Sequence, residues 1–293
     1  MVIVKLQGGL GNQMFQYANA FVLAKKKQTE LYLDLTLFIK RNAKKLITPR
    51  EYELNIFNLP GQILTSRQVK KIHQHKDFRL PFWKINNKLS YSFYTEKLYE
   101  FDENLYDAGL PIYLDGYFQS YKYFTEYAEI IQQLFAFENK HLLVSLSENL
   151  QKITNEDSVA VHVRRGDYVT NQQTNEHHGT CDLDYYEKSI SLILNEVNKP
   201  HFFFFSDDLL WVKEKFKNLA AAKTFVDENA GKNSWRDMFF MSKCKHNIIA
   251  NSSFSWWGAW LNQNKSKKVI APAKWVQLNV PLKDLIPDSW VQL

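Results

Sequence analysis

Two adjacent arginines, Arg164 and Arg165, are the residues of this sequence whose types and position best suit a chemical role. They follow the run Val159–Val163, which is short and mostly apolar, and they precede the turn residues Gly166 and Asp167. Such a run predicts a buried parallel strand, and open α/β sheets bind ligands outside the carboxyl ends of their strands. Guanidinium groups suit phosphate oxygens, so one interpretation is a phosphate site. The other is an ordinary strand followed by two arginines in surface ion pairs.

The alternation of side chains along a strand separates the two arginines. Residues two apart share a face, so His162 and Arg164 lie together and Arg165 points away from them. We therefore expect Arg164 to contact the anion directly and Arg165 to support the turn, against Asp167. His162 is either a core histidine with satisfied hydrogen bonds or a second contact to the ligand, and its place beside Arg164 favours the contact.

The second half of the chain alternates strand-like and helical segments, which predicts a parallel, doubly wound sheet. The strand-like runs are Val159–Val163, His201–Phe205, Thr224–Val226, Asn247–Ala250 and Lys268–Ala271. The helical segments are Leu183–Val197, Asp208–Phe216, Ser234–Cys244 and Phe254–Leu261. The polar strand ends are Arg164–Arg165, Ser206–Asp208, Asp227–Glu228 and Asn251–Ser253. We expect these ends to converge at the edge of the sheet where a nucleotide would bind.

Two of these strand ends allow a binding role and a capping role. Ser252 and Ser253 open a helix, where free backbone N–H groups and hydroxyls could hold a phosphate or the serines could cap the helix. Asp207 or Asp208 could accept hydrogen bonds from a guanine base, and Asp207 could instead cap the helix that follows.

The sequence predicts no metal site. Asp182 and Asp184 form an acidic triplet of the kind that can hold a metal, but they precede a helix, where acids act as caps and favour the helix dipole. The spacing of His177, His178 and Cys181 matches no tetrahedral zinc pattern.

The first half opens with a strand, a glycine-rich turn, a helix and a second strand. These segments are Val2–Leu6, Gln7–Gln13, a helix to about Lys25, and Leu31–Asp34. Gly9, Gly11 and Asp34 match part of a nicotinamide-dinucleotide fingerprint, but position 14 is Met in place of the third glycine. In the alternative interpretation the glycines let the backbone approach a ligand, while Asn12 and Gln13 present their amides to it.

The length of 293 residues suffices for two domains with separate cores. We place them at 1–145 and 146–293, with the last residues able to pack back on the first domain. Within the first, 111–120 predicts a strand with a polar end, and 65–100 predicts only loops and short helices.

The composition is ordinary for a soluble globular protein, with 23% charged and 45% hydrophobic residues. A net charge of +6 permits an anionic substrate or contact with an anionic membrane surface, and demands neither. A nucleic-acid-binding module is a weak alternative, because the basic residues from Lys40 to Arg50 form no single basic stripe. Only two cysteines, no apolar run of the length that spans a membrane and no secretory N-terminus predict a cytoplasmic protein.

Four stretches together resemble the bacterial α1,2-fucosyltransferases of glycosyltransferase family 11. They are Gly8–Ala18, Asp115–Ser120, Val161–Tyr168 and Asn251–Trp260, and the third carries the H-x-R-R-G-D element. The resemblance implies a GT-B architecture, in which two Rossmann-like domains face each other across a cleft. It also implies inverting transfer of L-fucose from GDP-β-L-fucose to the 2-hydroxyl of a terminal β-galactoside, with no metal or other cofactor. The first domain would then take the acceptor and the second the GDP-fucose.

The same resemblance implies roles for individual residues. Arg164 would contact the β-phosphate, with Arg165 beside it, and His162 would lie on the guanine side. Guanine would also be held by Asp208, with Asp207 as second choice. The remaining donor-binding candidates are Ser252 and Ser253, which would hold phosphate oxygens, and Gly11, Asn12 and Gln13, which would close over the donor from the first domain. The acceptor-side candidates are Tyr117, Gln119, Glu176 and His177.

The catalytic base is the weakest point of the resemblance. A glutamate that can serve as base in the α1,6 relatives has no counterpart here, which leaves Asp167, Glu176 and His177 as candidates, or an oxocarbenium-like mechanism with late proton loss. The expected partners are GDP-fucose and a galactose-terminated oligosaccharide or lipid-linked glycan, with peripheral contact to the inner membrane and no nucleic acid. The alternatives are a fucosyltransferase of another linkage and a nicotinamide-dependent oxidoreductase.

Overall fold

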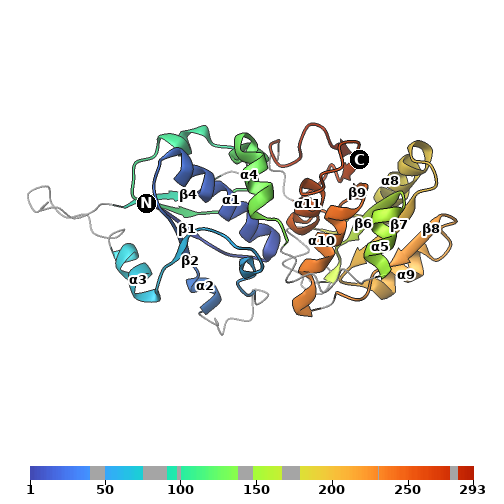
Figure 1. Cartoon of the computed structure of the whole chain (residues 1–293). Helices are drawn as coiled ribbons and strands as arrows, with labels where there is room; N and C mark the ends of the chain where they lie inside the picture. Colours follow the sequence, from blue (N-terminus) through green and yellow to red (C-terminus); the bar gives the residue numbers. More distant parts are fainter. Residues whose placement is uncertain are drawn as a thin grey trace, which may run out of the picture. The chain divides into compact units, whose positions relative to one another are not determined.

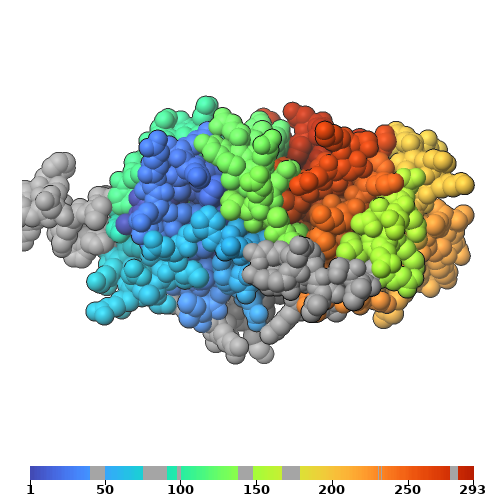
Figure 2. Space-filling model, viewed as in Figure 1, coloured from blue at the N-terminus to red at the C-terminus, as the bar shows by residue number. Residues whose placement is uncertain are grey.

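The computed structural model describes residues 1–39, 50–74, 91–97, 100–137, 148–166, 179–229, 231–277 and 283–293. The chain forms two compact units (Figure 1), of which the first comprises Met1–Ala136 and Pro281–Leu285 and the second Phe137–Val280 and Ile286–Leu293. Figure 2 shows the surface of the same residues, with the first unit in blue to green and the second in yellow-green to red. The predicted boundary between 145 and 146 lies outside the described residues.

The first unit is built on a parallel sheet with the strand order β3-β2-β1-β5-β4. The strands are β1 Val2–Lys5, β2 Leu31–Asp34, β3 Gln62–Ile63, β4 Ser92–Thr95 and β5 Ile112–Asp115. The α-helices are α1 Leu10–Lys26, α2 Thr36–Ile39, α3 Ser66–Gln74 and α4 Ala128–Leu134. The 3-10 helices are η1 Leu54–Ile56, η3 Glu103–Asp107, η4 Tyr121–Tyr123 and η5 Thr125–Tyr127.

The strands β1, β2 and β5 and the helix α1 confirm the sequence predictions. The strand β4 and the position at which α1 begins correct them. The prediction of loops and short helices over 65–100 was wrong for β4, because a four-residue, half-buried strand of polar and aromatic residues is too short to show a clear alternation. The predicted turn over Gln7–Gln13 is also too long, since α1 already begins at Leu10. Gly8 makes this early start possible: its φ is +79°, and a β-carbon there would lie 2.9 Å from that of Asn12.

The second unit is built on a parallel sheet with the order β11-β10-β9-β6-β7-β8, which confirms the predicted doubly wound α/β fold. Its strands are β6 Ser158–Val163, β7 His201–Ser206, β8 Ala222–Phe225, β9 His246–Ile248, β10 Val269–Ala271 and β11 Val291–Gln292. Its helices are α5 Glu148–Asn155, α8 Leu183–Glu196, α9 Leu209–Phe216, α10 Trp235–Lys243, α11 Ser253–Trp260 and the 3-10 helix η8 Gly231–Asn233. Each strand-like run and helical segment predicted from Val159 onward corresponds to one of these elements.

The order in which the chain adds strands to the second sheet reverses between β6 and β9. The chain passes from β6 to β7 and β8, and then continues on the other side of β6 with β9, β10 and β11. Val159, Val161 and Val163 of β6 pack in a core with α8 and α9, whereas the ring of His162 lies 5.9 Å from that of Phe254 in α11. Figure 1 shows α10 and α11 together on one side of β6 and β7. The carboxyl ends of β6 and β9 therefore lie at the point of the strand order where α/β sheets bind ligands.

Candidate active site

One carboxylate holds the arginine turn that follows β6. The Nη1 atom of Arg164 lies 2.9 Å from Oδ2 of Asp207, and the backbone N–H of Arg165 donates to Oδ1 of the same residue at 2.9 Å. Gly166 completes this packing, because a β-carbon there would lie 2.9 Å from Cγ of Asp207. The register explains the contacts: Val163 pairs with Ser206 across β6 and β7, so the residues after each strand run side by side. The interpretation of Asp207 as a helix cap is thus wrong.

Arg165 is braced by the helix that follows β7. Its Nε donates to Oδ2 of Asp208 at 3.2 Å, and its guanidinium group lies 4.0 Å from the ring centroid of Trp211. Asp208 also caps α9, since its Oδ1 accepts from the N–H of Trp211 at 3.2 Å. Arg165 is therefore held by Asp208 and Trp211, and its predicted role in supporting the turn stays a prediction. Asp167, the partner that we predicted, lies outside the described residues.

Trp211 is a site residue that the sequence reasoning missed. The signal that could have found it is its place three residues after the capping Asp208, which puts it in the first turn of α9 at the carboxyl edge of the sheet. Asp207 and Asp208 thus each contact an arginine, and the prediction that one of them binds guanine stays a prediction.

His162 is buried on the same strand face as Arg164. Its Nδ1 has no hydrogen-bond partner among the described residues, so the interpretation as a satisfied core histidine was wrong. Burial lowers the pKa of His162 to about 4, and the positive charge of Arg164 acts in the same direction, against the opposing effect of Asp207. The ring is therefore neutral near pH 7.

The loop before α11 is fixed by Asn251. Its Nδ2 donates to the carbonyls of Gly179 at 3.2 Å and Trp275 at 3.1 Å, while its Oδ1 lies 3.6 Å from the sulfur of Cys181. Asn251 thereby joins three loops at the carboxyl edge of the sheet. Ser252 caps α11 by accepting from the N–H of Phe254 at 3.3 Å, which confirms the capping interpretation. A phosphate contact from Ser252 or Ser253 remains compatible with that cap.

The acids before α8 have ordinary structural roles. Asp182 accepts from the N–H of Tyr185 at 2.8 Å and so caps α8, as predicted. Asp184 pairs with Lys188 at 2.6 Å. In the part of the chain that the structure describes, no group of three or more His, Cys, Asp and Glu side chains is placed to hold a metal.

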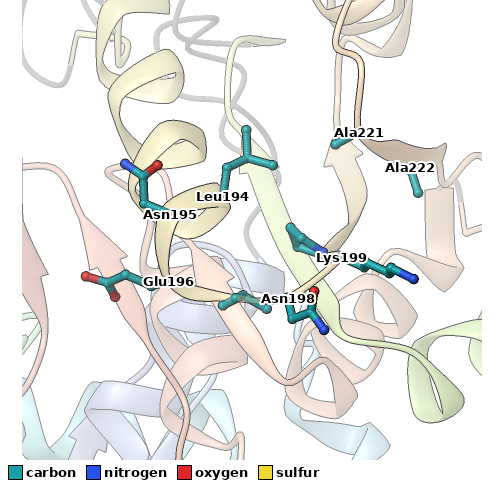
Figure 3. Close-up of a pocket in the computed structure, with 9 residues that line it drawn as sticks. Leu194, Asn195, Glu196, Asn198, Lys199, Ala221 and Ala222 are labelled. Atoms are coloured by element: carbon teal, nitrogen blue, oxygen red, sulfur yellow. The ribbon is translucent and has the colours of Figure 1, made fainter.

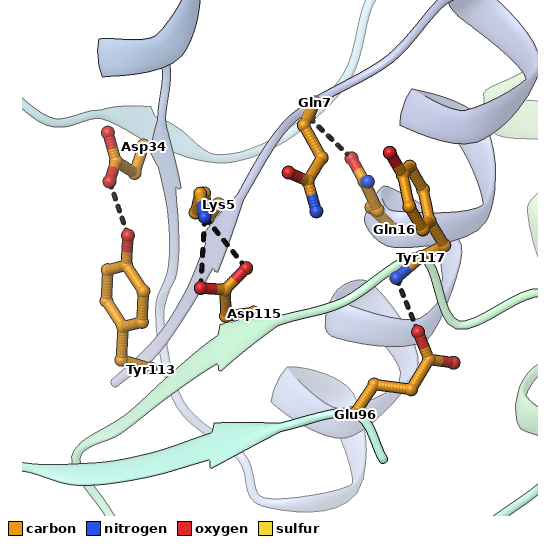
Figure 4. Close-up of polar contacts among 8 residues, drawn as sticks. All are labelled: Lys5, Gln7, Gln16, Asp34, Glu96, Tyr113, Asp115 and Tyr117. Atoms are coloured by element: carbon orange, nitrogen blue, oxygen red, sulfur yellow. Dashed lines mark hydrogen bonds and ion pairs between the residues drawn. The ribbon is translucent and has the colours of Figure 1, made fainter. Parts of the chain in front are cut away.

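In the first sheet, too, the chain adds strands first on one side of β1 and then on the other, where β5 lies. Two acceptor-side candidates follow β5. Lys5 at the end of β1 pairs with Asp115 at the end of β5 at 2.9 Å, as Figure 4 shows. Tyr117 and Gln119 come directly after β5, and Nε2 of Gln119 donates to Oδ1 of Asn12 at 2.7 Å. The other two acceptor-side candidates, Glu176 and His177, lie outside the described residues.

Of the two amides that the sequence suggested at the start of α1, that of Gln13 is buried, whereas Asn12 is partly exposed. Gln13 is fully buried: its Nε2 donates to the carbonyls of Gly8 and Glu51, and its Oε1 accepts from the N–H of Glu53. Gln13 therefore ties a neighbouring loop to the helix, and the expectation that it presents its amide to a donor was wrong. Gly11 is likewise buried within α1, so it lies in a helix where a turn was expected.

The nicotinamide alternative fails at two positions. Asp34 is 1% exposed, and its carboxylate accepts from the hydroxyl of Tyr113 at 2.5 Å (Figure 4) and from the N–H of Thr36 at 2.8 Å, so it cannot reach a ribose. The carboxylate of Glu53 lies at the start of α1, where it accepts from the N–H of Leu10. An acid thus occupies the helix terminus that would bind a pyrophosphate.

A surface hollow of about 680 Å³ lies elsewhere in the second unit. Its lining residues, drawn in Figure 3, come from the end of α8 and the segments that precede β7 and β8. These are the amino ends of the strands, so the hollow is at the opposite edge of the sheet from Arg164.

No described helix has the length and apolar character needed to cross a membrane.

Comparison with known proteins identifies the chain's relatives. A family model described as Glycosyl transferase family 11 matches residues 1–286. The O-antigen biosynthesis glycosyltransferase WbnK of Escherichia coli is 38% identical over 92% of this chain and 93% of its own length. An α-1,2-colitosyltransferase of Escherichia coli is 33% identical over 94% of this chain and 93% of its own length. Among solved structures, NodZ α-1,6-fucosyltransferase soaked with GDP-fucose matches 89% of this chain and 92% of that chain, with 14% identity and a TM-score of 0.49.

The match over nearly the whole chain, with the two relatives at 38% and 33% identity, defines the protein as a glycosyltransferase. It belongs to glycosyltransferase family 11. The resemblance inferred from four short stretches of sequence is thereby confirmed.

Proposed function

We propose that the protein transfers L-fucose from GDP-β-L-fucose to the 2-hydroxyl of a terminal β-galactoside, with inversion, to form an α1,2 linkage. The observation that carries the proposal is Arg164, which Asp207 holds at the carboxyl end of β6, where the second sheet reverses direction. A relative from Mus musculus, Galactoside 2-alpha-L-fucosyltransferase Sec1, supports the linkage, with 24% identity over 89% of this chain and 64% of its own length.

The proposed step is a single displacement at the anomeric carbon. The bond from the acceptor 2-oxygen to fucose C1 forms while the bond from C1 to the β-phosphate oxygen breaks, and the bonding electrons leave with GDP. Arg164 stabilises the negative charge that grows on the phosphate, a role for which one preorganised donor contributes about 2.7–4 kcal/mol. The N–H groups at the start of α11 support it. We place His162 on the guanine side of the donor.

The acceptor hydroxyl must also lose a proton. Asp167, Glu176 and His177 are the proposed bases, and loss of the proton late in an oxocarbenium-like step is the alternative. We propose that no metal takes part, since Arg164 and the helix start can carry the charge. Full activity in excess chelator is the expected result, and a loss of activity that Mg²⁺ or Mn²⁺ restores would refute this part of the proposal.

The O-antigen relative WbnK favours a cell-surface glycan as acceptor, either free or lipid-linked. We propose a cytoplasmic enzyme that reaches a lipid-linked glycan at the inner face of the membrane. Both cysteines are free, which fits a reducing compartment.

Colitosyl transfer is the second candidate, because the α-1,2-colitosyltransferase is 33% identical to this chain. Colitose is fucose without the 3-hydroxyl, so the two donors differ by one polar group. A site built to hydrogen-bond that hydroxyl discriminates strongly against the analogue that lacks it.

One experiment tests both candidates. The protein is incubated with GDP-fucose or GDP-colitose and a panel of β-galactosides that includes lactose, and the linkage of each product is assigned by NMR. An α1,2-fucosylated galactoside is the expected product. Transfer of colitose alone would select the second candidate, and transfer to a hydroxyl other than the 2-hydroxyl would overturn the linkage.

A further inference from the structure

The segment Gly116–Gln119, called the β5 loop below, is held by a partly buried acid that follows the neighbouring strand β4. Thr95 pairs with Asp115 in the register of β4 and β5, so the next residue along β4, Glu96, lies beside the loop. Its carboxylate accepts a hydrogen bond from the N–H of Tyr117 at 2.6 Å (Figure 4) and another from the N–H of Phe118 at 3.0 Å. Burial raises the pKa of Glu96. A carboxylate partly removed from water needs hydrogen bonds, and these two N–H groups supply them.

Two further features fix the loop in one conformation. A β-carbon on Gly116 would lie 2.7 Å from Oε2 of Glu96, so only glycine lets the carboxylate come this close. Phe118 has a left-handed backbone with φ of +52°, which is rare for a bulky residue, and its ring is fully buried near Tyr94 and Tyr123. Backbone strain of this kind persists where the surroundings enforce it, and it clusters at functional sites.

In this conformation the loop buries one side chain and leaves its two neighbours partly exposed. Phe118 is buried, whereas Tyr117 and Gln119 on either side of it are partly exposed. Gln119 is anchored through Asn12, at the start of α1. The loop therefore presents a phenol ring and an amide in fixed positions at the point where the first sheet reverses direction. An aromatic ring that covers the apolar face of a sugar and an amide that binds hydroxyls are suited to a galactoside.

We propose that Glu96 is a positioning residue for the acceptor: by clamping the β5 loop it holds Tyr117 and Gln119 where they bind the terminal galactose. The inference rests on the proposed function. A clamp that only stabilised the first unit would leave acceptor binding unchanged once the protein had folded.

The test measures acceptor binding and donor binding separately. Glu96→Ala and Glu96→Gln are assayed for the KM and kcat of transfer to lactose or the best galactoside, and for GDP affinity by calorimetry. We expect Glu96→Ala to raise the acceptor KM about tenfold or more, with GDP affinity unchanged, and Glu96→Gln to have a smaller effect because its amide oxygen still accepts one bond. Gly116→Ala, which displaces the carboxylate, should reproduce the effect.

The control removes a cap elsewhere in the same unit. Thr65 accepts from the N–H of Gln68 at 3.3 Å, at the end of β3, so Thr65→Ala weakens a helix start without touching the β5 loop. It should leave the acceptor KM unchanged. In a double-mutant cycle, the effects of Tyr117→Ala and Glu96→Gln on the acceptor KM should be less than additive, because part of what Glu96 does is to hold Tyr117.

The outcomes separate this inference from the proposed function. A wild-type acceptor KM in Glu96→Ala, or strict additivity of the Tyr117 and Glu96 changes, would overturn the positioning role while transfer itself stands. If Glu96→Ala does not fold, Glu96→Gln and the cycle decide. A wild-type enzyme that uses none of the galactosides would overturn the proposed function, and the inference with it.

Discussion

The guanidinium group of Arg164 lies 2.9 Å from the carboxylate of Asp207, although 43 positions separate the two residues in the sequence. The contact exists because Val163 and Ser206 end neighbouring parallel strands in register. Asp207 also accepts from the N–H of Arg165, so one side chain sets both the position of the turn and the direction of the arginine that points from it. In the proposed reaction, charge stabilisation by Arg164 therefore depends on an acid that does not itself need to contact the substrate.

Arg164→Ala should lower the turnover number about 100- to 1000-fold, because it removes a preorganised donor to the leaving phosphate. The measurement is kcat at saturating GDP-fucose, with circular dichroism to show that the fold is kept. Arg67, which is exposed on α3, supplies a matched control, and Arg67→Ala should be as active as the wild type. Near-normal turnover of Arg164→Ala would remove Arg164 from the mechanism.

Asp207→Asn should lower turnover about tenfold, since the amide oxygen can still accept from the N–H of Arg165 but no longer holds Arg164 by charge. Asp184→Asn, which removes an exposed ion pair with Lys188, is the control and should have no effect. Faster turnover in Asp207→Asn would contradict the positioning role, since it would mean that the acid restrains Arg164 from reaching the phosphate.

Asn251→Asp should destabilise the protein by about 2 kcal/mol or more, because the carbonyls of Gly179 and Trp275 lose their donor and face a buried carboxylate. Urea unfolding measures the difference in the free energy of unfolding. Asn195→Asp on the exposed side of α8 is the matched control, with an expected change near zero. Equal stability of the two variants would mean that Asn251 does not hold the three loops together.

The stability of the protein should fall in mild acid partly because of His162. Its pKa is lowered from 6.5 to about 4 in the folded protein, so the unfolded chain binds a proton more readily between these two values. Protonating the buried ring therefore costs free energy of folding. This cost is absent above pH 6.5 and grows as the pH falls toward 4, to about 3 kcal/mol in total. His162→Gln removes this contribution, so the difference between its unfolding free energy and that of the wild type should change across that window. A constant difference would show that His162 titrates normally.

The sequence predicted much of the second unit because its signals are local. The run Val159–Val163 is apolar and β-branched and ends in charge, and an equally short-range pattern, the acids Asp182 and Asp184 before a helical segment, predicts a capped helix start. The structure shows that Asp182 is the cap. Alternating strands and helices then determine a parallel sheet, whose carboxyl ends must share one edge. The strand β4, by contrast, is short and half-buried, so its pattern is too weak to separate from a loop.

What the sequence by itself determined is which residues follow which strands, and hence that Arg164, Asp207 and Ser252 reach the same edge of one sheet. Only the tertiary structure decided which of these side chains contact one another. Strand order and register place Arg164 against Asp207, Arg165 against Asp208, and Glu96 beneath the β5 loop. Strand order and register follow from the packing of the whole sheet and its covering helices, and periodicity within a segment carries no information about them.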